Sequence, residues 1–208
     1  MGVFGGTFDP VHIGHLTMAE QCREQAQLDQ VRFVPAARPP HKFEGSLTSF
    51  ADRVEMLRLA VAGHPSFVVD ELEAERPGPS FTVDTLETLA ARYPDAELEL
   101  IIGGDCVGDL PGWRSPARIV ELAGLLIVKR PGFASVTQQQ LRANLGLPMD
   151  APLRCREIDS PLVDISSHEL RERVAVGRTV RFLTPRAVEC YIETHKLYRT
   201  QSSKAENR

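Results

Sequence analysis

Cysteine is scarce in this chain, and its spacing excludes the sites that cysteines most often build. The four cysteines lie far apart and never form a Cys-x-x-Cys pair: Cys22, Cys106, Cys155 and Cys190. This spacing argues against a zinc site. In a reducing compartment it also argues against disulfides, so we expect four free thiols.

Long apolar runs and a strong net charge are absent as well. No stretch is long enough to span a bilayer, and no charged segment followed by an apolar one begins the chain. We therefore expect a soluble, cytoplasmic protein with no membrane partner. The formal net charge of −4 gives no general attraction for polyanions. Nucleic acid is accordingly not an expected partner, and a small phosphorylated ligand fits better.

The chain lacks any Pro/Gly/Ser-rich linker, break in composition or internal repeat. Its 208 residues, 42% of them hydrophobic, are enough for one globular domain with a full core. We predict a single domain over 1–198 and a disordered tail over 199–208.

Strand and helix patterns alternate along the sequence. Apolar runs predict strands at 2–4, 31–35, 67–69, 97–103, 124–129 and 153–158. Helical patterns cover 16–28, 52–62, 82–93 (capped by Thr82), a segment from 115, 137–145, a segment from 166 and 184–195. This order predicts an α/β fold with a doubly wound parallel sheet and a small helical C-terminal part. Ligands are expected at the carboxyl ends of the strands, near a topological switch point.

The most informative segment, residues 5–15, reads GGTFDPVHIGH and lies at a predicted strand-to-helix junction. Backbone N–H groups and the helix dipole favour a bound anion there. The two glycines allow the backbone to approach a ligand closely, and Thr7 adds a hydroxyl donor. His12 and His15 are one helical turn apart, so both rings can face one substrate. A tight turn with structural histidines is the alternative, but this context favours a phosphate site.

The run His12-Ile13-Gly14-His15 matches the (H/T)-x-G-H signature, and here the chain resembles the nucleotidyltransferase superfamily of α/β phosphodiesterases. The resemblance implies a Rossmann-like nucleotidyltransferase fold and transfer of a nucleotidyl group from a nucleoside triphosphate. It also implies that both histidines contact the triphosphate and its transition state. An acceptor phosphate then attacks the α-phosphorus and pyrophosphate leaves, so the enzyme mainly positions reactants and neutralises charge.

Two segments follow predicted strands. Residues 39–42, PPHK, present a histidine and Lys42 in a loop stiffened by prolines. Residues 103–105, GGD, end the central strand.

Two more segments begin predicted helices. In residues 80–82, SFT, Thr82 either caps the helix or, with exposed amides, binds a carboxylate. In residues 165–171, ISSHELR, Ser166 and Glu169 have the spacing of a capping box, and Arg171 would face the same anion as the amides.

The single tryptophan, Trp113, follows Leu110-Pro111-Gly112 beyond a strand's carboxyl end. A tryptophan usually belongs to the core. In this loop, however, Trp113 is well sited to stack on a flat ring, and a cationic pyridinium ring would gain from its π face.

Together these segments resemble the bacterial nicotinate mononucleotide adenylyltransferase family, from residue 2 to about 198. The resemblance implies that ATP and nicotinate mononucleotide react to give deamido-NAD and pyrophosphate, in NAD biosynthesis. Mg²⁺ would accompany ATP without a tightly bound protein metal site, and homo-oligomerisation is left open. In this family the helix start at Thr82 would hold the nicotinate carboxylate, Trp113 would stack on the ring, and Asp105 would meet ribose hydroxyls.

The resemblance assigns roles residue by residue. The catalytic residues would be His12, His15, Lys42 and Arg171. ATP would contact Gly5, Gly6, Thr7, Phe8, His12, His15, Gly103, Asp105, Ile165, Ser166, Ser167 and Arg171. Nicotinate mononucleotide would contact Lys42, Thr82, Val83, Asp105, Trp113 and Arg130.

One position departs from the family: His168 stands where threonine is usual. It either donates from its imidazole or faces solvent, and we expect solvent. One alternative function is adenylyl transfer to nicotinamide mononucleotide or phosphopantetheine, acceptors that lack the carboxylate. Another is a noncatalytic nucleotide sensor, which would not need a full set of donors at the reacting phosphate.

Overall fold

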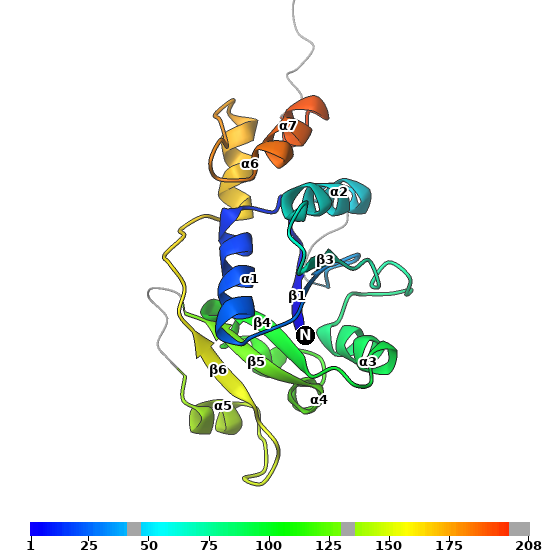
Figure 1. The fold of residues 1–208 in the computed structure, drawn as a ribbon, viewed down its shortest axis with the longest axis vertical. Helices are drawn as coiled ribbons and strands as arrows, with labels where there is room; N and C mark the ends of the chain where they lie inside the picture. The colour runs from blue at the N-terminus through cyan, green and yellow to red at the C-terminus, as the bar shows by residue number, and fades with distance from the viewer. Residues whose placement is uncertain (41–46, 130–135, 200–208) are drawn as a thin grey trace, which may run out of the picture.

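The sheet is the centre of the computed structural model, which describes residues 1–40, 47–129 and 136–199. Six parallel strands lie in the order β3-β2-β1-β4-β5-β6 (Figure 1). They are β1 (Gly2–Gly6), β2 (Val31–Pro35), β3 (Phe67–Val69), β4 (Leu98–Gly103), β5 (Ala123–Val128) and β6 (Cys155–Ile158). The strand order reverses at β1, which pairs with both β2 and β4. The predicted doubly wound α/β fold is therefore confirmed.

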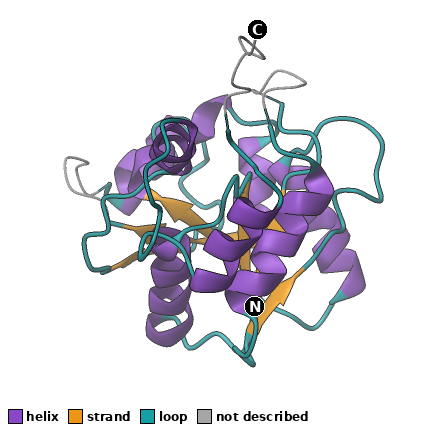
Figure 2. Ribbon diagram, turned by 90° about the horizontal axis from the view of Figure 1, so that it is seen from above, coloured by secondary structure: helices purple, strands orange, loops and turns teal. Residues whose placement is uncertain are grey.

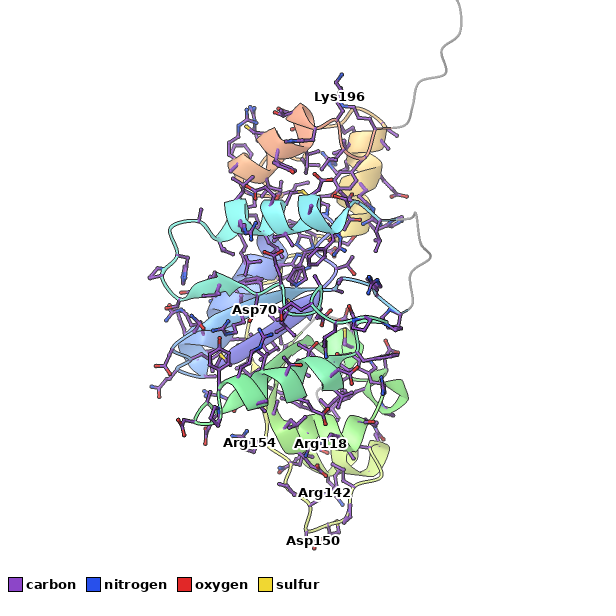
Figure 3. The ribbon with its side chains drawn as sticks, turned by 90° about the vertical axis from the view of Figure 1, so that its right-hand side faces the viewer. Asp70, Arg118, Arg142, Asp150, Arg154 and Lys196 are labelled. Atoms are coloured by element: carbon purple, nitrogen blue, oxygen red, sulfur yellow. The ribbon has the colours of Figure 1, made fainter. Side chains whose placement is uncertain are left out.

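Helices cover both faces of the sheet (Figure 2). In the described residues they are α1 (Ile13–Gln25), α2 (Phe50–Val61), α3 (Thr82–Arg92), α4 (Pro116–Leu122), α5 (Gln138–Asn144), α6 (Ser167–Ala175) and α7 (Arg186–Thr194), with 3₁₀ turns η1 (Gly104–Cys106) and η2 (Leu110–Gly112). The predicted helical C-terminal part is formed by α6 and α7. It lies at one end of the molecule with Lys196, opposite Arg142 and Asp150 (Figure 3).

Two hydrophobic clusters, one on each face, hold these layers together. Successive side chains of a strand point to opposite faces, so Ile101 belongs to one cluster while Leu100 and Ile102 belong to the other. The first cluster joins the sheet to α1, α2 and α7, and the second joins it to α3, α4 and α5. The buried runs of β4 and β5 are those expected of central parallel strands covered on both sides.

Helix α1 does not have its predicted bounds of 16–28. It begins at Ile13, directly after His12, which has extended dihedrals. It ends at Gln25 because Gln27 adopts a left-handed φ of +53°, and the N–H of Leu28 donates back to the Arg23 carbonyl at 2.9 Å. No glycine signals this end in the sequence, so the helical pattern predicted an end at Leu28.

Of the predicted tail, residues 199–208, only Arg199 belongs to the described residues. The single domain over 1–198 stays a prediction.

Candidate functional site

The loop after β1 lies at the switch point of the sheet, because β1 is flanked by β2 on one side and β4 on the other. Gly5 is exposed, and a Cβ there would meet nothing within 4 Å. A Cβ at Gly6 would lie 2.9 Å from the ring of Phe8. Phe8 is buried with a φ of +50°, and the Asp9–Pro10 peptide bond is cis. Gly6 is thus required by packing, whereas Gly5 leaves the backbone open to a ligand.

His12 and His15 form a stacked pair at the start of α1. His12 is the N-cap residue and is 3% exposed, and the two ring centroids are 3.7 Å apart. The Nδ1 atom of His15 accepts a hydrogen bond from the backbone N–H of His12 at 3.2 Å. The Phe8 ring meets His15 edge-on at 5.0 Å between centroids. The two rings therefore lie together, as predicted, but His12 precedes the helix instead of belonging to one of its faces.

Gly14 explains the small residue between the two histidines. A Cβ at this position would lie 3.1 Å from Cε1 and Nδ1 of His12. That distance is too short for an unshifted ring, so glycine permits the stacked arrangement of the pair.

Backbone carbonyls of the loop from Thr7 to Val11 are held by side chains from distant parts of the chain. The donors are Arg53 of α2, Ser167 and Arg171 of α6, and Thr184 before α7. Arg53 donates to Thr7 (2.8 Å), Arg171 to Asp9 (2.7 Å), Ser167 to Pro10 (2.8 Å) and Thr184 to Val11 (2.8 Å). These four hydrogen bonds hold the loop in place from α2, from α6 and from the segment before α7.

The start of α6 has the predicted capping box. The Ser166 hydroxyl accepts from the Glu169 N–H at 3.2 Å, and the Glu169 carboxylate accepts from the Ser166 N–H at 3.0 Å. Hydrogen bonds from Ser166 lower the pKa of Glu169, which keeps this carboxylate ionised at neutral pH. His168 is exposed and pairs with Glu172 at 3.3 Å between Nε2 and Oε1, so the expectation that it faces solvent is confirmed.

A cavity of about 300 Å³ opens beside the histidine pair. It lies between the first half of α1, the carboxyl end of β5 and the segment that leads into α6. Its lining residues are His12, Gly14, Met18, Val128, Lys129 and residues 160–166, which include the predicted Ile165 and Ser166. Lys129 is held at the rim by Asp159, with 2.9 Å between Nζ and Oδ1.

Gly103 and Asp105 lie where the prediction puts them, at the carboxyl end of the neighbouring strand. Gly103 is the last residue of β4, and Asp105 lies in η1. The parallel pairing of β1 with β4 brings this end next to the loop of residues 7–12.

The start of α3 differs from the prediction in its cap. Thr82 is the first helical residue, and the N-cap is Phe81, which has no side-chain acceptor. The prediction that Thr82 caps the helix is therefore wrong. An extended Phe81 moves Thr82 one position into the helix, and α3 begins with no side-chain cap. Its first N–H groups, those of Thr82 and Val83, suit an anion.

Arg114 ties the tryptophan loop to this helix start. Its guanidinium lies 4.8 Å from the centroid of the Phe81 ring, and its Nη1 atom lies 3.3 Å from Oδ2 of Asp84. Trp113 immediately precedes it and is partly buried against the second hydrophobic cluster. The predicted contributors to pyridine binding, Thr82 and Trp113, thus come from two segments that contact each other.

Two predicted residues, Lys42 and Arg130, lie outside the described residues. Their predicted contacts have no structural counterpart here.

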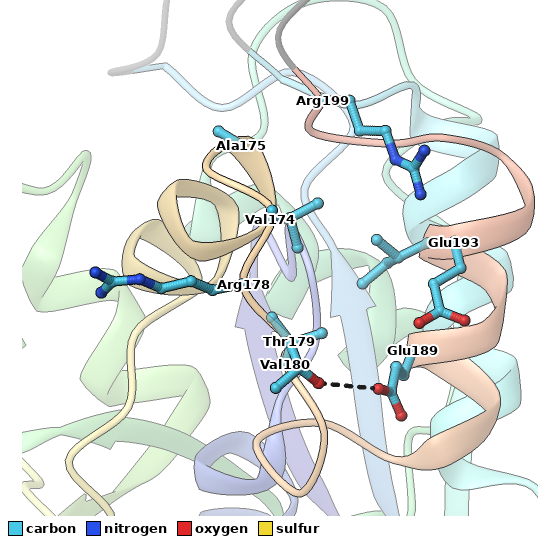
Figure 4. A pocket seen from close by; sticks show the side chains of 10 residues that line it. Val174, Ala175, Arg178, Thr179, Val180, Glu189, Glu193 and Arg199 are labelled. Carbon is cyan, nitrogen blue, oxygen red and sulfur yellow. Dashed lines mark hydrogen bonds between the residues drawn. The ribbon is translucent and has the colours of Figure 1, made fainter.

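A hollow of about 490 Å³ lies between α6 and α7, and none of the predicted site residues lines it (Figure 4). The buried Glu189 at its wall accepts a hydrogen bond from Thr179 at 3.4 Å and pairs with Arg186 at 2.6 Å.

Within the described ranges, no three His, Cys, Asp or Glu side chains come together as a group able to hold a metal ion. Among the helices of this part of the chain, none has the length and apolar character needed to cross a membrane. The four cysteines form no disulfide within the part of the chain that the structure describes, and burial raises the pKa of the Cys22 thiol to about 12.

Comparison with known proteins identifies the family. The profile of the Cytidylyltransferase-like family matches residues 3–173. The chain belongs to this family. Within it, the chain is 46% identical over 200 residues to the probable nicotinate-nucleotide adenylyltransferase of Thermomicrobium roseum, covering 96% of this chain and 92% of the relative. It is 44% identical over 206 residues to the one of Geobacillus thermodenitrificans, covering 99% and 89%.

Solved structures show the same cytidylyltransferase-like fold. Plasmodium falciparum nicotinic acid mononucleotide adenylyltransferase, complexed with NaAD, superposes with a TM-score of 0.77 at 20% identity. The match covers 95% of this chain and 96% of that one. The complex of the same protein with APC gives a TM-score of 0.76 at 19% identity. At such identities the likeness establishes the fold.

Sequence reasoning missed several residues that build the site. Arg53 carried a usable signal, because it is an arginine among the apolar residues of a helix and a buried cation must find acceptors. Thr184 and Tyr198 carried no such signal. Thr184 donates to the Val11 carbonyl, 173 residues away, and the Tyr198 hydroxyl donates to the Asp9 carboxylate, 189 residues away.

Proposed function

We propose that this protein transfers the adenylyl group of ATP to nicotinate mononucleotide, giving deamido-NAD and pyrophosphate. One observation carries the proposal: the stacked His12–His15 pair lies at a helix start beside a fixed, glycine-led loop at the sheet's switch point. The relatives of 44–46% identity, named as probable nicotinate-nucleotide adenylyltransferases, support the choice of substrates.

The hydrogen bond within the histidine pair sets the proton of His15. Its Nδ1 accepts from the His12 N–H, so the ring proton of the neutral imidazole lies on Nε2. His15 then offers an Nε2–H donor to a phosphate oxygen. A donor fixed in advance stabilises charge that develops during the reaction.

The reaction is a displacement at the α-phosphorus of ATP. A phosphate oxygen of nicotinate mononucleotide forms the new P–O bond, and the bond between the α-phosphorus and the bridging oxygen breaks. The electron pair of that bond leaves with pyrophosphate. No group on the protein needs to form a covalent bond, so the residues act by orienting the two substrates and by neutralising charge.

ATP and the acceptor would occupy opposite sides of the switch point. The cavity beside His12 has apolar walls from Val128, Leu162 and Val163, which suit the adenosine part of ATP. The uncapped start of α3 and Trp113 would hold the nicotinate carboxylate and ring. We retain Asp105 for ribose hydroxyls, and Lys42, Arg171 and Arg130 for phosphates and acceptor.

Magnesium would enter with the triphosphate. The donors at the histidine pair are nitrogen atoms and backbone N–H groups, which complement phosphate oxygens rather than a hard cation. The residues present therefore fit a metal held by phosphate oxygens and water. Bound in that way, Mg²⁺ would neutralise charge on the phosphates.

We further propose that the protein acts in the cytoplasm, with small nucleotides as its partners. Binding of nucleic acid is not expected from the net charge of −4.

The deciding experiment compares two acceptors. Pyrophosphate release is measured with ATP and Mg²⁺ and with either nicotinate or nicotinamide mononucleotide. A charge-assisted contact to the carboxylate is worth roughly 1.5–3 kcal/mol, so kcat/KM should be about ten- to a hundredfold higher for the acid. Equal efficiency would contradict the nicotinate assignment, and no pyrophosphate release with either acceptor would contradict adenylyl transfer itself.

A further inference from the structure

The carboxylate of Asp9 is buried in the middle of the loop that leads to His12. Asp9 is 1% exposed. Its Oδ1 accepts from the hydroxyl of Tyr198 at 2.7 Å, and its Oδ2 accepts from the backbone N–H of Thr48 at 3.2 Å. A buried carboxylate is costly unless hydrogen bonds replace water, so these two donors determine where Asp9 can lie.

A buried arginine of α2 holds the same loop. Arg53 is 2% exposed and donates to the carbonyls of Thr7 (2.8 Å) and Thr48 (3.2 Å). Burial lowers the pKa of Arg53, and the negative charge of Asp9 opposes that shift. The charge of Asp9 therefore stabilises the buried guanidinium, while Arg53 and Thr48 join the loop to α2.

Tyr198 reaches Asp9 from the far end of the chain. It follows α7, where the N–H of Leu197 donates to the Ile192 carbonyl at 3.0 Å. Its backbone has a left-handed φ of +62°, which is unfavourable for a residue with a side chain. Its ring packs against the first hydrophobic cluster, and its hydroxyl lies 3.9 Å from Sδ of Met56. The segment after α7 is thus held in a conformation that delivers one hydroxyl to one buried carboxylate.

We propose that Tyr198 is a positioning residue for adenylyl transfer, acting through Asp9 on the loop that places His12 and His15. The inference rests on the proposed function. Asp9 lies between the glycines of the loop and the N-cap His12, and the Asp9 carbonyl also accepts from Arg171. A change in the position of Asp9 would therefore reach both a catalytic histidine and a predicted phosphate ligand. Reaction rates are very sensitive to such changes, because a misplacement of about 1 Å can cost on the order of 100-fold.

The test is Tyr198→Phe, which removes the hydroxyl and keeps the ring. We expect kcat to fall about tenfold, with the KM values of both substrates changing less than about twofold. The matched control is Tyr191→Phe. The hydroxyl of Tyr191 donates to Oδ1 of Asp52 at 2.8 Å, the same kind of contact from the same C-terminal part, but the other hydrogen bonds of Asp52 are with Ser49 at the start of α2. Its kcat should stay at the wild-type value.

A second measurement separates positioning from stability and from the proposed reaction. The ¹⁵N shifts of the His15 imidazole, which report the acceptor Nδ1, should change in Tyr198→Phe and not in Tyr191→Phe, whether or not the protein turns over. In a cycle with Asp9→Asn, the two changes should not add in kcat. The proposal is overturned if Tyr198→Phe leaves the His15 signals unchanged, or if both Tyr variants lose kcat equally for an equal loss of Tm. Unchanged turnover of Tyr198→Phe in an active enzyme also overturns it.

Discussion

His15 is the residue whose loss should affect the proposed reaction most directly. His15→Ala removes the Nε2–H donor that the hydrogen bond from His12 orients. Loss of one preorganised donor usually lowers kcat by about 10²–10³-fold, and we expect that range here. His168→Ala is the control, because His168 is an exposed histidine that pairs with Glu172. The measurement is kcat at saturating substrates, with Tm to show that both variants fold. Near wild-type turnover of a folded His15→Ala protein would contradict the role.

Gly14 permits a test of how accurately the histidine pair must be placed. Gly14→Ala puts a Cβ 3.1 Å from the His12 ring, which must shift by a few tenths of an ångström. We expect kcat to fall about three- to tenfold while the protein stays folded, because the shift disturbs geometry without removing a donor. Gly108→Ala is the control, since a Cβ there meets nothing within 4 Å and should leave kcat unchanged. Equal rates for the two variants would show that the stacking is dispensable.

Between elements, Arg114 is expected to align the tryptophan loop with the start of α3. Arg114→Ala removes the contacts to Phe81 and Asp84. The side chains of Arg114 and Asp84 are both partly exposed, so their ion pair is weak. We therefore expect a modest effect: about a two- to fivefold higher KM for nicotinate mononucleotide, with the KM for ATP unchanged. Arg118→Ala is the matched control. Arg118 pairs with Glu87 of α3 and with Glu121, in place of the residues at the start of α3 that Arg114 contacts. A parallel rise in the KM for ATP in the Arg114 variant would argue for a general loss of structure.

The strands could be predicted from the sequence more accurately than the ends of the helices. Bounds for β2 and β3 agree with the structure, because short apolar runs leave little choice of register in a buried parallel sheet. The helix ends depended on single backbone conformations. Gln27 takes a left-handed φ with no glycine to signal it, and Phe81 takes the N-cap position in place of Thr82.

The partners of the residues that fix the site loop could not be predicted in the same way. Arg53, Thr184 and Ser167 donate to backbone carbonyls, and a carbonyl is present at every position of the chain. Sequence patterns identify the glycines and histidines of the predicted phosphate site. They do not identify the distant side chains that hold the loop, because any of many polar residues could reach it once the fold is formed.

At the scale of the whole molecule, the sheet separates two halves of the proposed reaction. The loop after β1 and the cavity beside β5 would take ATP, whereas the start of α3 and the loop that carries Trp113 would take the acceptor. Both sets lie at the carboxyl ends of parallel strands, where one switch point brings them together. The C-terminal part reaches the same point through Thr184 and Tyr198. It therefore belongs to the site rather than only to the periphery of the fold.

Three groups with strongly raised pKa values lie on the face of the sheet that carries α1, α2 and α7. Burial raises the pKa of the Cys22 thiol from 9.0 to about 12, and burial with the Asp52 hydrogen bond raises that of Tyr191 from 10.0 to about 12. Burial and the negative charge of Asp9 raise the pKa of Tyr198 still further. All three belong to, or pack against, the first hydrophobic cluster. Each group stays protonated in the folded protein at a pH where the unfolded chain has lost the proton.

The folded protein should therefore lose stability as pH rises. The contribution of these neutral groups is complete below pH 9.0, the unfolded value for the thiol, and declines as pH rises through the unfolded and then the folded pKa values. A tenfold difference in proton affinity between the folded and unfolded states corresponds to about 1.4 kcal/mol in the free energy of unfolding. Urea midpoints measured from about pH 7 to 10.5 should fall steeply in the wild type and less steeply in Cys22→Ala. An identical slope for Cys22→Ala and wild type would mean that burial does not raise the pKa of this thiol in the folded protein.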